Sequence, residues 1–127
     1  MNDEPSKYQH AEITNKIIQS FYQVYNQIGS GFEKEVYVNS LFLAAKNLEL
    51  VVNKNQILDI EFSGEKVGQM SADLIIENKV LVQVFNDKKM DSFSEQKTYN
   101  QLKNSKLKVG LILNFGVNPE FKRKEIF

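Results

Sequence analysis

The polar residues most suggestive of chemistry follow an apolar run. Asp87 and Lys89 stand two residues apart, directly after Val80–Phe85. Residues two apart share one face of a strand, so a strand that continued here would place Gln83 and Phe85 on the side of Asp87. A carboxylate is a hard oxygen ligand for Mg²⁺, and metal-assisted chemistry stabilises charge that develops on a phosphate ester. A solvated turn is the ordinary explanation of the same residues.

The second half of the chain carries most of the positive charge, although the whole sequence has 16 basic and 16 acidic residues. Basic side chains can bind phosphates, and aromatic rings near them can stack on bases. A solvated surface and ordinary core packing are the simpler explanations. The basic candidates are Lys88, Lys89, Lys97, Lys103, Lys106, Lys108, Lys122, Arg123 and Lys124, and the aromatic ones are Phe93, Tyr99, Phe115 and Phe121.

The composition limits the kinds of site and the cellular location that we expect for this protein. The absence of cysteine excludes disulfides and thiolate metal sites and favours a reducing compartment. His10, the one histidine, has no partner at a metal-binding spacing, so we interpret it as structural or disordered. The first twelve residues do not resemble a signal peptide, and no run approaches the roughly 20 apolar residues of a membrane span. We therefore expect a soluble, cytoplasmic protein that does not contact a membrane.

Apolar spacing predicts the elements that position these residues. Spacings of three and four predict a helix over 13–28, with Thr14 near its start, and a second helix from about 32 to 47. Gly29-Ser30-Gly31 separates the two helices and favours a hairpin. Alternating and continuous apolar runs predict strands over 50–52, 57–62, 67–76, 80–85 and 107–115, with a helix over about 93–104.

This order of elements predicts an α/β sandwich with a mixed sheet. Tight turns at 63–66 and 77–79 make three successive strands antiparallel neighbours, and the last strand returns through a helical crossover. We expect one domain over residues 1–127, with a polar N-terminal extension at 1–12 and a capping C-terminal tail at 116–127. An exposed sheet edge, or the run 111–113 if left uncovered, could support a homo-oligomer.

Three segments carry a resemblance to a known family. "IIQSFYQVYNQIGSGFEKEVY", "SADLIIENKVLVQV" and "LKVGLILNFG" together resemble the GxxExxY family, small prokaryotic proteins of the PD-(D/E)XK nuclease superfamily. The resemblance spans about residues 13–116. It implies a restriction-endonuclease-like αβββαβ core, with a mixed central sheet flanked by helices. It also implies a Mg²⁺-dependent nuclease site made of acidic residues and a lysine that positions or activates water.

The positions of that site can be compared one at a time. Asp73 matches the family's strand aspartate, and Tyr37 matches the tyrosine of its helical motif. Gln83 stands where the family has a metal-binding glutamate, and Phe85 stands where it has a lysine. Lys34 occupies the position of the helical glutamate, which reverses the charge. The resemblance therefore implies a degenerate site in which Asp73 is the one remaining candidate metal ligand.

The family's motif near residues 93–102 is also incomplete in this sequence. Near residues 93–102 the family often has a histidine-glutamate pair and a glutamine, whereas Ser94, Glu95 and Lys97 stand at these positions. An ammonium near the metal position repels a divalent cation. We hypothesise that a salt bridge between Lys34 and Asp73 replaces the metal, with Gln83 hydrogen-bonded beside it and a ring in the lysine's former volume. In the alternative interpretation, Lys34 simply points to solvent.

Three functional interpretations remain open. The leading one is a catalytically inactive nuclease-like protein that acts as a binding or assembly module for an unknown protein or nucleic acid, without a cofactor. The second is a Mg²⁺-dependent nuclease with a rearranged site that uses Asp73, Glu77 or Asp87, and Lys88 or Lys89. The third is a protein that binds nucleic acid without cleaving it, for which Lys88, Lys89, Lys97 and Lys103 are the candidate contacts.

Overall fold

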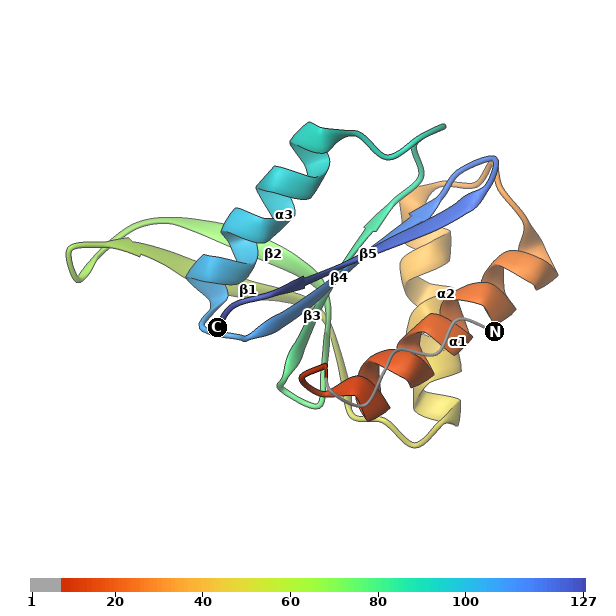
Figure 1. The fold of residues 1–127 in the computed structure, drawn as a ribbon, viewed down its shortest axis with the longest axis horizontal. Helices are drawn as coiled ribbons and strands as arrows, with labels where there is room; N and C mark the ends of the chain where they lie inside the picture. Colours follow the sequence, from red (N-terminus) through yellow and green to blue (C-terminus); the bar gives the residue numbers. More distant parts are fainter. Residues whose placement is uncertain (1–7) are drawn as a thin grey trace.

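The computed structural model describes residues 8–127, which form three helices and five strands (Figure 1). The helices are α1 (Ala11–Ile28), α2 (Lys34–Asn47) and α3 (Ser92–Ser105). The strands are β1 (Val52–Phe62), β2 (Glu65–Ile76), β3 (Val80–Phe85), β4 (Val109–Phe115) and β5 (Pro119–Glu125). The α/β class and the mixed sheet predicted from the sequence are confirmed.

The five strands form one sheet in the order β1-β2-β3-β4-β5. β3 and β4 are parallel, and the other neighbouring pairs are antiparallel. A parallel pair needs a crossover connection, and the chain between β3 and β4 supplies one by forming α3. This arrangement is the helical crossover that the order of apolar segments predicts.

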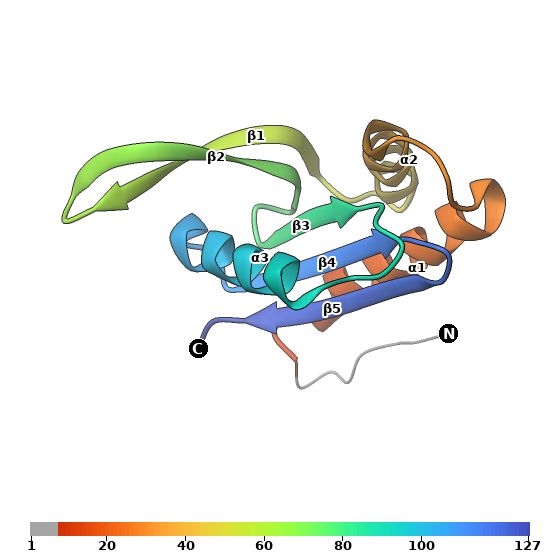
Figure 2. The same cartoon turned by 90° about the horizontal axis from the view of Figure 1, so that it is seen from above.

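The helices cover the two faces of the sheet, with α1 and α2 on one face and α3 on the other (Figure 2). The larger core joins Phe21 and Leu41 of the first two helices to strand residues that include Val82 and Leu111. The smaller core joins Leu102 of α3 to Leu81 and its neighbours. Burial on both faces explains why β3 and β4 are almost continuously apolar.

The β1–β2 hairpin extends beyond the rest of the sheet as a two-stranded ribbon (Figures 1 and 2). Pairing of β2 with β3 covers only Leu74–Ile76, whereas pairing with β1 continues to Glu65. The ribbon turns at Ser63-Gly64, where both residues have a positive φ, a conformation that favours glycine in two-residue hairpin turns. The ribbon therefore leaves β3 at the point where Asp73 and Gln83 face each other across the two strands.

The end of the chain differs from its prediction. Residues 116–127 were expected to form a capping tail, but Pro119–Glu125 form β5, which pairs antiparallel with β4 along its whole length. Polar side chains and a proline concealed the strand, because both are tolerated at the edge of a sheet. β5 also encloses Leu111–Leu113, which are fully buried, so this run offers no surface for association.

The start of α1 also differs from its prediction. Thr14 lies inside the helix, where its hydroxyl donates to the Ala11 carbonyl. His10 occupies the N-cap position with a positive φ, and its carbonyl oxygen accepts from the amides of Ile13 and Thr14. His10 therefore has a structural role. Within residues 8–127 no helix is long and apolar enough to span a membrane.

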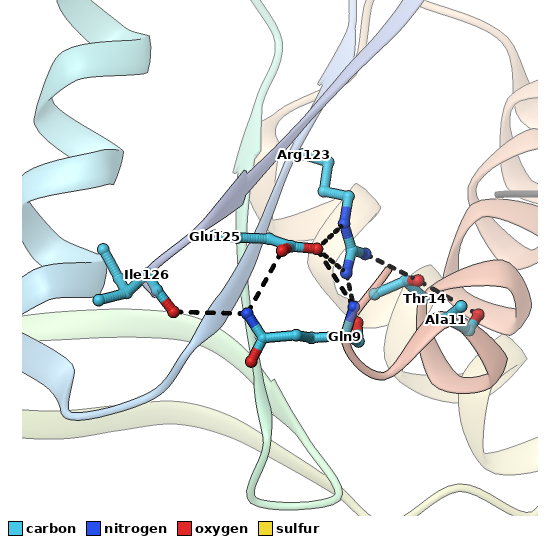
Figure 3. A network of polar contacts seen from close by, with 6 residues as sticks. All are labelled: Gln9, Ala11, Thr14, Arg123, Glu125 and Ile126. Atoms are coloured by element: carbon cyan, nitrogen blue, oxygen red, sulfur yellow. Dashed lines mark hydrogen bonds and ion pairs between the residues drawn. The ribbon is translucent and has the colours of Figure 1, made fainter. Parts of the chain in front are cut away.

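A polar network ties β5 to the start of α1 (Figure 3). The Arg123 guanidinium donates to Glu125 through Nε at 2.7 Å, to the Gln9 carbonyl, and to Thr14 Oγ1 at 3.0 Å. Gln9 also donates to the Glu125 carboxylate through its backbone and its side chain. Burial raises the pKa of Glu125, but the hydrogen bonds from Arg123 and Gln9 outweigh burial, so the pKa is lowered overall.

This network predicts an acid-sensitive contribution to stability. The lowered pKa of Glu125 means that its ionised form stabilises the fold above the unfolded-state pKa of about 4.3, and that this stabilisation is lost as the pH falls through the folded pKa. We expect Glu125→Gln to reduce the difference in unfolding free energy between pH 7 and pH 3, measured by urea denaturation. Gln19→Ala, which changes an exposed side chain of α1 that carries no titratable group, is the control and should leave that difference unchanged.

Candidate functional site

The candidate site lies where β2 bends away from β3. Leu74 and Ile76 belong to the core beneath α1 and α2. Ala72 and Ile75 both belong to the core beneath α3. Side chains three apart share a face only if the regular alternation of a strand is interrupted between them. Asp73 lies at this interruption, and its side chain turns to the face covered by α2.

Gln83 closes the gap that opens between the two strands. Its Oε1 accepts from the Asp73 backbone amide at 2.8 Å, and its Nε2 donates to the Ser71 carbonyl at 3.1 Å. The same Nε2 donates to Gln101 Oε1 of α3 at 3.0 Å. Gln83 is 5% exposed, so these contacts replace the backbone pairing that β2 and β3 no longer make. A glutamate could not donate to Ser71 or Gln101.

The Asp73 carboxylate has two partners, a backbone amide and a lysine ammonium. Its Oδ2 accepts from the Val84 backbone amide at 2.8 Å and lies 3.1 Å from Lys34 Nζ. The Asp73 side chain is 10% exposed and the Lys34 side chain is 50% exposed. The ion pair hypothesised from the sequence is therefore present, and Gln83 is hydrogen-bonded beside it. Both sequence interpretations of Lys34 hold in part. Its ammonium pairs with Asp73, and half of its side chain remains in solvent.

Tyr37 holds the beginning of α2 in place. Its hydroxyl donates to the Gly29 carbonyl at 2.8 Å and accepts from the Phe32 amide at 3.2 Å. Its ring is fully buried and stacks on Phe115, with centroids 4.2 Å apart. Lys34, the first residue of α2, is thereby fixed relative to the sheet. Tyr37 has a clear structural role in this geometry.

Phe85 ends β3 and lies opposite Asn114 of β4. Its side chain is partly buried. The ring has neither the oxygen ligands of a carboxylate nor the ammonium of a lysine. The expectation that its ring fills the volume of a former lysine stays a prediction.

The alternative site at residues 87–89 requires β3 to continue past Phe85, which it does not do. β3 ends at Phe85, so Asp87 and Lys89 do not continue a strand face. The Asp87 amide donates to Asn114 Oδ1, and its carbonyl accepts from Asn114 Nδ2, both at 3.0 Å. A Cβ at Gly116 would lie only 2.4 Å from the Asp87 carbonyl oxygen, so the loop packs closely against the end of β4. Asp87 is therefore part of an exposed loop.

Glu77 is also separated from the site. It lies in the β2–β3 turn with a positive φ, and its Oε2 accepts from the Val51 amide at 2.5 Å. Glu77 lies four positions after Asp73 along the chain, which is about 13 Å at 3.3 Å per residue. The structure therefore does not bring Glu77, Asp87 and Asp73 together.

The basic candidates are dispersed. Arg123 contacts Glu125, and Lys124 contacts Glu95 at 3.2 Å. Lys97 and Lys103 lie on the exposed side of α3. Lys88 and Lys89 are exposed in the preceding loop. Of the aromatic candidates, Phe93 is exposed, Tyr99 and Phe121 are partly buried and Phe115 is core.

Sequence patterns missed part of the site's surroundings. A hollow of about 340 Å³ lies beside the ion pair. Its lining consists of Lys34, Glu35, Val38, Asn39, Asn55 and Asp73. Helical spacing turns Glu35 about 100° from Lys34, yet both residues line this hollow. Asn55, with its positive φ, comes from the irregular part of β1 opposite Asp73, a feature that no local pattern indicates.

The residues of this site do not fit the Mg²⁺ ion of a nuclease. Mg²⁺ needs several hard oxygen ligands in octahedral geometry. Asp73 is already neutralised by Lys34, the amide of Gln83 is committed to backbone and side-chain hydrogen bonds, and Phe85 offers no ligand. No group of three or more histidine, cysteine or acidic residues with metal-binding geometry occurs among residues 8–127.

Comparisons with known proteins agree with the fold. A solved structure described as "Crystal structure of SSO0001" is similar, with a TM-score of 0.54 and 10% sequence identity over 92% of this chain. The match covers 58% of that chain, so this protein spans less than two thirds of its length. No curated protein matches. Residues 11–125 match the model of the PD-(D/E)XK nuclease superfamily, and the chain therefore belongs to this superfamily.

Proposed function

We propose that this protein is a catalytically inactive member of the superfamily that acts in the cytoplasm as a binding or assembly module. The ion pair between Lys34 and Asp73 is the observation that carries the proposal. A lysine ammonium 3.1 Å from the carboxylate holds the positive charge that a divalent cation would otherwise supply. Within the superfamily we place the chain with the prokaryotic GxxExxY proteins, on the resemblance of the segments around Tyr37, Asp73 and Phe115.

The hydrogen bonds of Gln83 support the same proposal. A metal-binding glutamate at this position would present a second carboxylate to Asp73 and would lose the donor to Ser71. The amide instead joins β2, β3 and α3 through contacts of 2.8–3.1 Å. The former site thus serves to hold the sheet together where the ribbon leaves it.

We expect the protein not to cleave nucleic acid. Single-stranded and double-stranded DNA and RNA labelled with fluorescein should remain intact in 5 mM Mg²⁺ or Mn²⁺, at about the level of a buffer control, because Asp73 alone cannot hold the metal. Calorimetric titration with Mn²⁺ should detect no tight site. The matched control is Asp73→Asn, which keeps an oxygen for Val84 but removes the charge.

The outcome of this assay is decisive in both directions. Cleavage that disappears in Asp73→Asn would establish a nuclease with a rearranged site and would overturn the proposal. Cleavage that persists in Asp73→Asn would point to a contaminating nuclease, and repurification under denaturing conditions followed by refolding should remove it.

A further inference from the structure

One face of α3 carries a row of amide side chains. Gln96, Asn100 and Asn104 are four residues apart and exposed, and Gln101 lies beside them. A helix that packs on a sheet usually presents apolar side chains at such spacings, yet α3 buries only Thr98 and Leu102. The amide row and the β1–β2 ribbon line the same groove. The ribbon runs past α3 in both views of the fold (Figures 1 and 2).

The space between α3 and the ribbon is a groove of about 590 Å³. Apolar side chains from three elements contribute to it, and the ring of Phe93 is 75% exposed at one end. The groove is lined by Ile60, Gln69, Met70, Phe93, Gln96, Lys97, Asn100, Gln101 and Asn104. The helix wall is polar apart from Phe93, and the ribbon wall offers the apolar side chains of Ile60 and Met70 beside Gln69. The groove can therefore hold both the backbone and the side chains of one extended chain.

The spacing of the amides fits an extended polypeptide. Residues four apart on a helix are separated by about 6.0 Å along its axis. An extended chain presents its peptide groups to one side every second residue, which is about 6.6 Å. The distance from Phe93 to Asn104 spans about 17 Å of helix, which is enough for about five extended residues.

The amides can bind peptide groups without losing the fold. Gln96 Nε2 donates to Asn100 Oδ1 at 3.2 Å, and Asn104 Nδ2 donates to the Asn100 carbonyl at 2.8 Å. A side-chain amide has two donor hydrogens and two acceptor lone pairs, so each of the three retains a donor and an acceptor. A peptide group also has one donor and one acceptor, and the two can pair.

The charge of the groove favours an extended polypeptide over a nucleic acid. Lys97 is the one charged residue in its lining. The adjacent hollow holds Lys103 and Lys106 together with Asp59 and Glu61, so its charges balance. A nucleic acid has a phosphate at every nucleotide and needs several basic contacts. An uncharged segment with a single acidic residue opposite Lys97 complements the groove.

We propose that the groove between α3 and the β1–β2 ribbon binds an extended, mostly uncharged polypeptide segment of a partner protein through the amide row. The inference deepens the proposed binding role by naming the partner's chemistry. Gln101 accepts from Gln83 at 3.0 Å, so the groove is connected to the degenerate site by one hydrogen bond. Gln83, which stands where the resembling family has a metal-binding glutamate, is thus also bonded to the amide network of α3.

The test uses a phage library of random 12-residue peptides, panned on the full chain in EDTA, with enriched peptides synthesised for calorimetry. We expect binding that weakens at least tenfold in Asn100→Leu, because this exposed amide lies in the middle of the row. Gln19→Leu changes an exposed amide of α1 and should leave affinity unchanged. N-methylation along the peptide should disrupt binding at alternate residues, since only every second peptide group faces α3.

Three results with peptides would overturn this inference. They are a library that yields no binder, binders that tolerate Asn100→Leu, and an N-methylation scan without period two. Binding of a fluorescein-labelled single-stranded oligonucleotide that is lost in Asn100→Leu would also overturn it in favour of nucleic acid. Because the assay contains EDTA, it is independent of cleavage, so catalytic activity would contradict the proposed inactivity without affecting the result at the groove.

Discussion

Replacing Gln83 with leucine should lower the free energy of unfolding by about 3 kcal/mol, although the side chain keeps nearly the same volume. Leucine would leave the buried Asp73 amide without the partner that now lies 2.8 Å away. It would also remove the donors to Ser71 and Gln101. An orphaned buried polar group loses its solvation without compensation, which costs about 1–3 kcal/mol. Urea denaturation followed by circular dichroism measures the change.

A matched substitution separates this effect from a general loss of glutamine. Gln69→Leu changes an exposed residue of β2 and should alter the free energy of unfolding by less than about 0.5 kcal/mol. If Gln83→Leu were equally mild, the amide would not hold the two strands together. The structural role proposed for Gln83 would then be wrong.

The glutamate variant adds a pH dependence with a defined sign. In Gln83→Glu a buried carboxyl faces Asp73, and burial beside a like charge should raise the pKa of the new group. A raised folded pKa means that the folded state holds its proton more tightly than the unfolded state. The stability of the variant should therefore fall as the pH rises from about 4.3 through the raised pKa. Wild type lacks this component at position 83.

Introducing the three residues that the resembling family has at positions 34, 83 and 85 should create a metal site. In a variant that combines Lys34→Glu, Gln83→Glu and Phe85→Lys, carboxylates would flank Asp73 and repel one another until a cation neutralises them. At a free Mn²⁺ concentration of about one hundred times Kd, binding to the folded state adds about 2.7 kcal/mol of stability. We expect the melting temperature to rise by about 10 °C, whereas wild type should not respond.

Two further proteins make this experiment interpretable. Adding Asp73→Asn to the triple variant should abolish most of the Mn²⁺ response, because the central ligand loses its charge. Circular dichroism without metal must first establish that the triple variant is folded, and the variant with Lys34→Gln and Gln83→Glu provides a milder substitute. A wild-type response as large as that of the triple variant would refute the idea that Lys34 stands in for the cation.

Local patterns were sufficient to predict most elements of the fold. The three-and-four spacing around Phe21 and Leu41 arises because one helix face must pack on the sheet, so it is visible in the sequence. The continuous apolar runs of β3 and β4 reflect burial on both faces. The crossover through α3 followed from the order of these elements. β5 escaped prediction because an edge strand has one unpaired side and tolerates polar residues.

The candidate site was predicted only in part, and that part came from the family resemblance rather than from apolar periodicity. The resemblance aligned Lys34 and Asp73 although they are far apart in the sequence, and their distance of 3.1 Å agrees with the hypothesised pair. Periodicity alone would have assigned Asp73 to the face of Ile75, under α3. The interruption of β2 and the separation of the strands turn it towards α2 instead. That interruption depends on contacts with β1 and β3, which local sequence does not contain.

The sequence by itself determined the types of the groups at the candidate site, an ammonium, a carboxylate, an amide and a ring, because those are properties of single residues. It also determined which segments could be helices or strands, because burial imposes a period that is written locally. Only the tertiary structure decided that Gln83 joins β2 to α3 and that the amides of α3 face a groove along the ribbon. Those relations join residues distant in the chain, and only packing brings them together.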